Sequence, residues 1–424
     1  MKLKDSEQLH LKTEKEQSQQ KQKSYSLNFS IRSISLRNIS LLISTLISAL
    51  AYTPSSANIT DVEQDAIMPG LIHHHFIKHT SRGAVIINAL EIDMQKGFTV
   101  RPALAQENTI WAKATLPSIV AREGAYAGIN ANYFNSRGLP IGSLAIDSEW
   151  ITGPVLNRAS LSIDKNGKAY FARPSVTGHL QVFKGYSNNP FSASFPSNKP
   201  SQLALRLNSI NQPDSLNQHG ISFYNHWWQD SVTCGDGRTC VLVDGKGIVR
   251  LKVNSQEDKT SLYPTKTDYV LSALTNSSFT GINVGDKVTL TWYSKPDWSY
   301  TSHVIGGGPL LLSKGEIVLD ESAEGFTAAS GLGSSAPRTA VGITAVGRLI
   351  WVTADGRSKN SVGLSLNELA HLLKDIGVVE AMNLDGGGST TMVLDGKIIN
   401  SPSDSGGPRR VSNALLLYKP TSSY

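Results

Sequence analysis

The sequence lacks the features that mark disulfide-rich or cysteine-zinc proteins, transmembrane proteins and nucleic-acid-binding proteins. Two cysteines in 424 residues cannot build a disulfide-rich scaffold, nor can they supply a four-cysteine zinc site. The apolar run Leu41–Ala51 has 11 residues, fewer than the roughly 20 that a transmembrane helix needs. Beyond residue 40, 32 Lys and Arg residues face 30 Asp and Glu residues without a basic cluster. Such a chain lacks the surface that binds a nucleic-acid backbone, and we expect no nucleic-acid partner.

The excess positive charge is concentrated at the N-terminus. Residues 1–40 hold eight Lys and Arg against four Asp and Glu, out of a formal charge of +6 for the chain. This basic segment, the apolar run and the small residues Ser55-Ser56-Ala57 follow one another as in a secretory signal. The alternatives are a signal anchor that stays in the membrane and a buried helix. We expect an exported protein, whether periplasmic, secreted or envelope-associated, that meets a membrane only through residues 1–57.

The two cysteines lie close together. Cys234 and Cys240 are separated by five residues, two of which are glycine. A zinc site would need further ligands nearby, and none is evident. A small disulfide loop is the better interpretation, and it agrees with an oxidising compartment.

Short strands dominate the predicted secondary structure. From about residue 143 to 290, apolar runs alternate with Gly, Pro, Asn and Ser, a spacing typical of antiparallel sheets. A hairpin is expected between Arg338–Thr344 and Leu349–Thr353. We therefore predict an α+β fold of mixed, largely antiparallel sheets with a few flanking helices. Residues 58–424 are expected to form a single domain, whose less distinctive middle part spans about 180–300.

Two helices are predicted. One covers Trp111–Arg122, despite Pro117 within it. The other follows Ser365, which forms a capping box with Glu368, and it ends at Gly377.

The most concentrated polar stretch is Asn383–Met392, in which Asp385 is followed by three glycines, a serine and two threonines. An apolar run precedes it, and a hairpin with an Asp395-Gly396 turn follows it. The glycines allow close approach of a ligand to backbone N–H groups. A nucleotide loop is excluded, because no Gly-Lys-Ser/Thr follows. The other glycine run, Gly306–Gly308, precedes a proline and not a helix.

Three other groups of residues have two interpretations each. Asn130 and Asn132 are expected on one face of a strand, where they bind sugar hydroxyls, orient a carboxylate or bond to one another. Trp227 and Trp228 form either a platform for sugar stacking or a buried aromatic pair. His73–His75 is expected to be a surface or strand feature, because adjacent strand residues point to opposite faces and three in a row cannot converge on a metal.

Several blocks in the second half of the chain, taken in order, resemble the phosphodiester glycosidase family, which includes bacterial exopolysaccharide-associated members. The resemblance extends from about Pro69 to Tyr418, with further blocks around Asn130–Asn135, Gly306–Leu310 and Arg410–Leu415. The four blocks that carry it are Arg338-Thr-Ala-Val-Gly342, Val352-Thr-Ala-Asp-Gly-Arg357, Ser365-Leu-Asn-Glu-Leu-Ala370 and Asn383-Leu-Asp-Gly-Gly-Gly-Ser-Thr-Thr-Met392.

The resemblance implies hydrolysis of a sugar 1-phosphodiester of the α-N-acetylglucosaminyl type, in an envelope or extracellular polysaccharide. We expect Asp385, and after it Asp355, to be the catalytic carboxylates. Arginines suit phosphate because their planar fork binds it at two points, although an ion pair with these aspartates is the alternative. The residues expected to bind substrate or phosphate are Arg338, Arg357, Arg410, Asn130, Asn132, Asn383, Gly386, Gly387, Gly388, Ser389 and Thr390.

Other functions remain open at this level. The chain is alternatively a hydrolase of other cell-wall glycans or a non-catalytic carbohydrate-binding envelope protein. Ser389 makes a weak nucleophile candidate, since the Gly-x-Ser-x-Gly pattern is absent. No cofactor is expected. Carboxylates in loops leave Ca²⁺ open as an alternative, which the sequence does not support, since no segment has the ordered Asp-x-Asp-x-Asp-Gly pattern of a Ca²⁺ loop.

Overall fold

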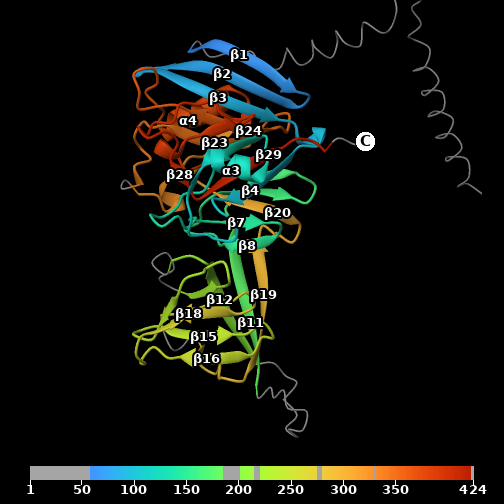
Figure 1. Ribbon diagram of the computed structural model, residues 1–424, viewed down its shortest axis with the longest axis vertical. Coiled ribbons are helices and arrows are strands. Elements are labelled where there is room, and N and C mark those ends of the chain that lie inside the picture. Colours follow the sequence, from blue (N-terminus) through green and yellow to red (C-terminus); the bar gives the residue numbers. More distant parts are fainter. Residues whose placement is uncertain (1–57, 185–200, 214–219, 275–278, 328–329, 422–424) are drawn as a thin grey trace, which may run out of the picture. The chain divides into compact units, whose positions relative to one another are not determined.

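Strands make up most of the regular secondary structure of the protein, a computed structural model shown in Figure 1. It describes residues 58–184, 201–213, 220–274, 279–327 and 330–421. The predicted leader, residues 1–57, lies outside them. The predicted α+β class is therefore only partly right: the fold is mainly β, and the described residues contain two α-helices.

An eight-stranded antiparallel sheet carries several of the candidate residues at its strand ends. The expected hairpin is confirmed, since Arg338 lies opposite Ala354 and Ile343 opposite Leu349. In spatial order the strands are β1 (Ile59–Met68), β2 (Leu71–Thr80), β3 (Gly83–Ile92), β24 (Leu349–Ala354), β23 (Arg338–Thr344), β25 (Val378–Asn383), β21 (Leu310–Ser313) and β22 (Glu316–Ile317).

Two five-stranded sheets and a two-stranded one complete the part of the fold that holds the candidate site. The first is β27 (Lys397–Ile398), β26 (Met392–Leu394), β6 (Ala127–Asn130), β29 (Asn413–Tyr418) and β4 (Thr99–Leu104). The second is β10 (Ala169–Ala172), β9 (Ser160–Asp164), β20 (Thr301–Gly306), β7 (Leu144–Ile146) and β8 (Glu149–Thr152). The pair is β28 (Arg410–Val411) with β5 (Ala114–Thr115).

The middle of the chain forms a seven-stranded sheet with a core of its own. Among the described strand pairs, β12 with β13 is the only parallel one. The strands are β16 (Val249–Val253), β15 (Thr239–Val243), β18 (Tyr269–Ala273), β13 (Ile221–Tyr224), β12 (Ser201–Ile210), β11 (Ser175–Phe183) and β19 (Lys287–Lys295), beside a small pair, β14 (Val232–Cys234) with β17 (Thr260–Leu262). The buried side chains between them include Leu180, Leu207, Val241, Val249, Leu271 and Phe279.

The disulfide prediction is confirmed in this middle part. Cys234 and Cys240 are bonded across the short loop between β14 and β15, with their Cα atoms 5.6 Å apart. The two tryptophans differ: Trp228 is buried and packs edge-on against Trp111, at 5.0 Å between ring centroids, whereas Trp227 is only half-buried. Only Trp228 therefore fits the buried interpretation.

Both helices form where local signals favour them. α4 (Leu366–Asp375) begins at the predicted capping box: the N–H of Glu368 donates to the Ser365 hydroxyl at 3.2 Å, and the N–H of Ser365 donates to the Glu368 carboxylate at 2.8 Å. Its chain leaves through Gly377, whose φ of 80° favours glycine. α3 (Leu116–Glu123) begins later than the predicted Trp111, because Pro117 fits only the first turn of a helix.

The main core lies between the eight-stranded sheet and the two five-stranded sheets. It buries large side chains from all three, including Leu90, Ile129, Leu161, Trp351, Met382 and Leu415. Trp351 is completely buried, which holds β24 and so the start of the Asp355 loop in place. No helix in the described part of the chain is long and apolar enough to cross a bilayer.

Candidate active site

The glycine turn links β25 to β26. β25 ends at Asn383, residues Gly387–Ser389 form a single 3-10 turn, and β26 begins at Met392. Gly387 has a φ of 60°, which favours glycine. The predicted hairpin after the turn is confirmed, since Val393 pairs with Ile398 around Asp395 and Gly396, both at positive φ.

The backbone N–H groups of this turn are largely used inside the protein. The N–H of Gly387 donates to the Pro337 carbonyl at 2.8 Å. Those of Ser389 and Thr390 donate to carbonyls of the turn itself, at 3.1 and 3.2 Å. The sequence suggested a cradle of N–H groups for phosphate, and these three are not available for it.

Arginine side chains lie on the turn instead. A Cβ at Gly388 would collide with the guanidinium of Arg409 and with the carboxylate of Asp404. A Cβ at Gly387 would lie 3.2 Å from a terminal nitrogen of Arg357. The absence of side chains at these positions lets two guanidiniums approach the backbone beside Asp385.

Asp385 has an unusual acidity for an aspartate. Burial raises the pKa of its carboxyl to about 6, while the Ser389 hydroxyl, the Arg409 guanidinium and the Gly386 N–H each lower this pKa. A carboxylate with a pKa near neutrality is mostly ionised at pH 7 and still basic enough to accept a proton. Ser389 itself is fully buried, and its hydroxyl faces the Asp385 carboxylate, which it stabilises in the ionised form.

Asn130 holds the backbone of Asp385. Its side-chain amide donates to the Asp385 carbonyl at 2.6 Å. Its oxygen accepts from the Thr339 hydroxyl at 2.9 Å and from the Thr391 N–H at 3.1 Å. These bonds join β6 to β23 and to the far end of the turn, so Asn130 positions the carboxylate through the backbone.

Asn132 is bonded to another asparagine. Its side-chain oxygen accepts from the Asn413 amide at 2.9 Å, and its backbone N–H donates to the Asn413 side-chain oxygen at 3.0 Å. The Asn132 amide also donates to the Ser143 carbonyl at 3.0 Å. With 1% of its surface exposed, this side chain joins two sheets and has no free group for a sugar.

Asn383 and Tyr133 form a polar wall beside Asp385. The Asn383 amide donates to the Tyr133 hydroxyl at 2.7 Å, and that hydroxyl donates to the Gly308 carbonyl at 2.9 Å. Burial and the charge of Asp385 raise the pKa of Tyr133, so it stays protonated. The side-chain oxygen of Asn383 is buried and has no partner among the described residues.

A third arginine, Arg158, lies over this wall. Its guanidinium carbon is 5.6 Å from the centre of the Tyr133 ring and 4.1 Å from that of Phe326. Its buried Nε has no hydrogen-bond partner in the described part of the chain. Burial lowers the pKa of Arg158, while the charges of Tyr133 and Glu324 raise it.

The predicted arginines differ from one another in what they contact. Arg338 is 2% exposed and donates to the backbone carbonyls of Leu364, at 2.8 Å, and Leu332, at 2.6 Å. It therefore anchors two loops and forms no ion pair with either aspartate. Arg357 is exposed, has a φ of 59°, and lies against Gly387 without an ion pair among the described residues.

Arg410 and its neighbour Arg409 point to different surroundings. Arg410 donates to the Lys113 carbonyl at 3.0 Å and belongs to β28. Arg409 lies on the turn at Gly388 and is held there by Asp404 through two hydrogen bonds of 2.8 and 3.0 Å. The charge next to Asp385 thus comes from Arg409, one residue away from the predicted position.

Asp355 binds the chain that follows the hairpin. Its carboxylate accepts from the Ser401 N–H at 3.0 and 3.1 Å and from the Asn400 amide at 3.1 Å. Asn400 also donates to the Thr390 carbonyl at 3.2 Å. Burial raises the pKa of Asp355, which is 3% exposed. Its hydrogen bonds make Asp355 a support for the end of the turn.

Metal ligands do not converge in the described part of the chain: no group of three His, Cys, Asp or Glu residues is close enough to hold an ion. The histidine triplet lies on β2 with separate partners. His73 is 3.1 Å from the Asn88 side-chain oxygen, and His74 is 3.0 Å from the Glu91 carboxylate.

Sequence reasoning missed Arg409, Tyr133 and Arg158. Arg409 adjoins a predicted residue and Tyr133 adjoins Asn132, so local patterns pointed to both neighbourhoods. Arg158 follows a loop with no motif, and nothing in the sequence marks it.

Comparison with known proteins supports the family resemblance that the sequence motifs indicate. A model of the family named phosphodiester glycosidase matches residues 238–418. The N-acetylglucosamine-1-phosphodiester alpha-N-acetylglucosaminidase of Mus musculus is 36% identical over 124 residues, which are 28% of this chain and 24% of the mouse protein. The chain thus spans about a quarter of the length of this curated relative.

Solved structures share the fold over much more of the chain. A crystal structure of a hypothetical protein from Synechocystis has a TM-score of 0.71 and 25% identity, and the match covers 84% of this chain and 64% of that one. A protein from Burkholderia pseudomallei has a TM-score of 0.61 and 24% identity over 79% of this chain and 74% of that one. Motifs, relatives and the matched residues 238–418 together confirm that this chain resembles the phosphodiester glycosidase family.

Proposed function

We propose that the protein is an exported hydrolase that cleaves the glycosidic bond of sugar 1-phosphodiesters, of the α-N-acetylglucosaminyl type, in envelope or extracellular polysaccharide. The observation that carries this proposal is the Asp385 carboxylate with a pKa of about 6, next to a turn on which two guanidiniums lie. The phosphodiester glycosidase match over residues 238–418 includes this turn and supports the reaction class.

The reaction divides into bond-making and bond-breaking at the anomeric carbon. Water adds to that carbon, the bond from the carbon to the phosphate oxygen breaks, and its electron pair leaves with the phosphate. The products are the free sugar and a phosphomonoester. Asp385 takes the proton of the attacking water, which its pKa near neutrality allows.

The leaving group makes a strong acid catalyst less necessary. A departing phosphate carries its negative charge on several oxygens, so charge stabilisation replaces protonation. Arg357 has no carboxylate partner among the described residues, and Arg409 keeps one terminal nitrogen outside its two bonds to Asp404. Both guanidiniums are suited to bind the phosphate oxygens.

The other side of the site is suited to the sugar. Tyr133 and Asn383 present a hydroxyl and a buried, unpartnered amide oxygen beside Asp385. The buried Ser389 hydroxyl lies on the Asp385 carboxylate and stabilises its ionised form. Arg158, against Tyr133 and Phe326, supplies a further cation. N-acetylglucosamine as the sugar is inferred from what the mouse relative's name says of that protein.

Export is supported by two features. The disulfide between Cys234 and Cys240 is stable in an oxidising compartment. The leader carries the charge and apolar pattern of a signal, and detection of a mature protein that begins near Asn58 would establish cleavage.

The decisive experiment measures free sugar released from a synthetic N-acetylglucosamine 1-phosphodiester. Wild-type protein is expected to release N-acetylglucosamine, and Asp385→Asn is expected to lower kcat by about 10²- to 10⁴-fold, as for loss of a general base. Asp395→Asn is the matched control, because Asp395 is an exposed aspartate at a positive φ that asparagine also adopts.

Three outcomes would contradict parts of the proposal. Full activity of Asp385→Asn would remove that residue from the chemistry. Hydrolysis of wall glycans without phosphate, and not of the phosphodiester, would favour the alternative hydrolase. Tight glycan binding without hydrolysis of either substrate would favour a non-catalytic carbohydrate-binding protein.

A further inference from the structure

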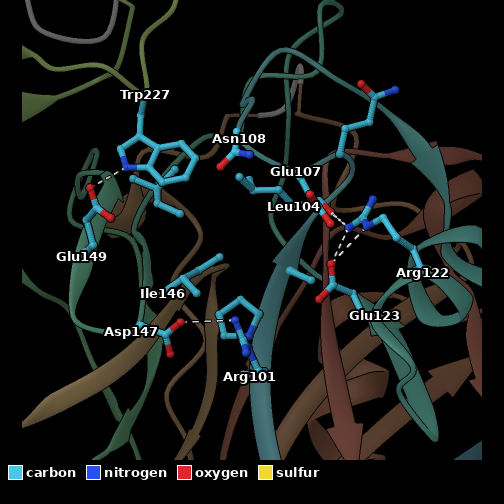
Figure 2. Close-up of a pocket in the computed structure, with 14 residues that line it drawn as sticks. Arg101, Leu104, Glu107, Asn108, Arg122, Glu123, Ile146, Asp147, Glu149 and Trp227 are labelled. Atoms are coloured by element: carbon cyan, nitrogen blue, oxygen red, sulfur yellow. Dashed lines mark hydrogen bonds and ion pairs between the residues drawn. The ribbon is translucent and has the colours of Figure 1, made fainter. Parts of the chain in front are cut away.

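A polar cavity of about 320 Å³ lies away from the glycine turn (Figure 2). Three elements supply its walls: the end of β4 with the loop after it, the end of α3, and the β7–β8 hairpin. Trp227, from the loop after β13, closes one side. Its volume falls within the roughly 300–1,000 Å³ typical of sites for small molecules.

The cavity is separated from Asp385 by two intervening strands. In the sheet β27-β26-β6-β29-β4, β26 follows the glycine turn and β4 lines the cavity. Adjacent strands lie about 4.8 Å apart, so β26 and β4 are about 14 Å apart across the sheet. No residue of the turn lines the cavity.

The charges in the cavity disfavour an anion. The Arg122 guanidinium donates to the carbonyls of Leu104 and Ala105 and to the Glu123 carboxylate, so little of it is left for a ligand. Arg101 is paired with Asp147 at 3.3 Å. Glu107 and Glu149 line the cavity as well, so carboxylates outnumber guanidiniums by four to two. A phosphate group would be repelled here.

The cavity has one aromatic wall and several hydrogen-bond acceptors. Figure 2 shows the Trp227 indole beside the cavity, with its N–H donating to the Glu149 carboxylate at 2.8 Å. That bond sets the ring's orientation and leaves part of its surface exposed. Ile146 continues the apolar surface, while Glu107 and Asn108 lie across from it.

We infer that this cavity is a second saccharide-binding site, which takes a neutral sugar unit of a glycan. A sugar has an apolar face of C–H groups, which packs against an indole, and an edge of hydroxyls, which donate to carboxylates. A neutral sugar meets both walls, whereas an anion meets excess negative charge. The inference rests on the proposed function only in taking a glycan as the ligand.

The test uses the full-length Asp385→Asn protein, so that hydrolysis does not consume the ligand. The tetramer of N-acetylglucosamine is titrated into this protein, and binding is followed by its tryptophan fluorescence and by the heat of binding. Saturable binding is expected, and Trp227→Ala in the same background should weaken it about tenfold or more, the effect of losing one stacking contact. Glu149→Gln, which keeps the size of the side chain, should weaken binding by about three- to tenfold.

Two controls separate this site from other effects. Tyr263→Ala removes an aromatic side chain that lies outside the cavity and is 63% exposed. The affinity of this variant for the tetramer should stay within about twofold of that of the parent protein. Circular dichroism melting establishes that each variant folds. If Trp227→Ala does not fold, Glu149→Gln decides the result.

Several outcomes would overturn the inference. One is the absence of saturable binding by tetramers of N-acetylglucosamine, glucose or galactose at millimolar concentrations. Another is unchanged affinity in both variants. Tighter binding of the de-N-acetylated, cationic tetramer, lost at high salt, would instead identify a cation site. Failure of this titration leaves the phosphodiester assay untouched, because that assay concerns Asp385 and not the cavity.

Discussion

The glycine turn and the cavity beside Trp227 adjoin β26 and β4 of one five-stranded sheet, and they differ in their charge. At the β26 end, Arg357 and Arg409 lie on the glycine turn beside Asp385. At the β4 end, the two arginines of the cavity are already bonded to carboxylates or carbonyls, and two further glutamates remain. The turn is therefore suited to the anionic ester that we propose as substrate, and the cavity to the neutral glycan that we infer.

The comparison shows that residue type alone does not assign a role. Two guanidiniums and two carboxylates, those of Asp385 and Asp404, lie at the turn, whereas two guanidiniums and four carboxylates line the cavity. The arginines also differ in what their bonds inside the protein leave for a ligand. Arg357 has no ion pair among the described residues and Arg409 keeps one terminal nitrogen outside its bonds to Asp404, whereas Arg122 of the cavity donates to two carbonyls and to Glu123. Each prediction below changes one charge at the glycine turn and asks whether the contrast survives.

The largest effect is expected from the two neighbouring arginines. Arg409→Gln should lower kcat/KM for the phosphodiester by about 10²-fold, because it removes a cation from the leaving phosphate. Arg410→Gln should change it by less than about threefold, because Arg410 donates to the Lys113 carbonyl instead. Steady-state rates of sugar release distinguish them. Equal losses of kcat/KM in both variants would contradict the different roles assigned to the two arginines.

The pH profile provides a sharper measure of the charge at the turn. Asp385 must be ionised to accept a proton, so kcat/KM should fall about tenfold per pH unit below its pKa of about 6 and level off above it. Arg409 lowers the pKa of Asp385, so Arg409→Gln should move the inflection to higher pH. The profile of Arg410→Gln is the control. An inflection at the same pH in Arg409→Gln and wild type would mean that the charge of Arg409 does not act on the Asp385 carboxylate.

The smallest effect is expected on stability, and its sign follows from the raised pKa. Below about pH 3 the Asp385 carboxyl is protonated in both the folded and the unfolded protein. As the pH rises through about 6, the folded protein loses stability, because it disfavours the ionised form. At pH 7, Asp385→Asn should therefore raise the free energy of unfolding by on the order of 1–3 kcal/mol.

Thermal melts at two pH values measure this gain. The difference between Asp385→Asn and wild type should vanish at about pH 3, where wild type carries almost no charge at this position in either state. Asp395→Asn, at an exposed hairpin position, should show no such dependence on pH. A variant less stable than wild type at pH 7 would mean that Asp385 serves the fold more than the reaction.

Local patterns predicted the parts of the site that neighbouring residues build. The capping box of α4, the β23–β24 hairpin, and the Asp395-Gly396 turn all depend on residues a few positions apart, and all are confirmed. The apolar spacing predicts that α3 begins at Trp111, whereas it begins at Leu116, because Pro117 fits only the first turn of a helix. The two expected helices and the antiparallel strands both form, and the fold is mainly β because these helices are short and few among the described residues.

Contacts between distant segments were beyond such patterns. Asn132 is bonded to Asn413, 281 residues away, and Asn130 to the carbonyl of Asp385, 255 residues away. The sequence leaves sugar binding, orientation of a carboxylate and mutual hydrogen bonding open for both asparagines, because no residue near them in the chain indicates a partner. The same limit made Arg409 and Arg410 indistinguishable, because only the pairing of β28 with β5 decides which of them faces the turn.

Residues close together along the chain are enough to predict the Asp385 turn, its flanking strands and the disulfide loop. Short motifs of such residues also carry the resemblance to the phosphodiester glycosidase family. Tertiary structure alone decided which guanidiniums approach Asp385, that burial raises its pKa to about 6, and that a separate cavity forms beside Trp227. The physical reason is that charge pairing and desolvation depend on neighbours in space, and strand pairing brings those neighbours from far apart in the chain.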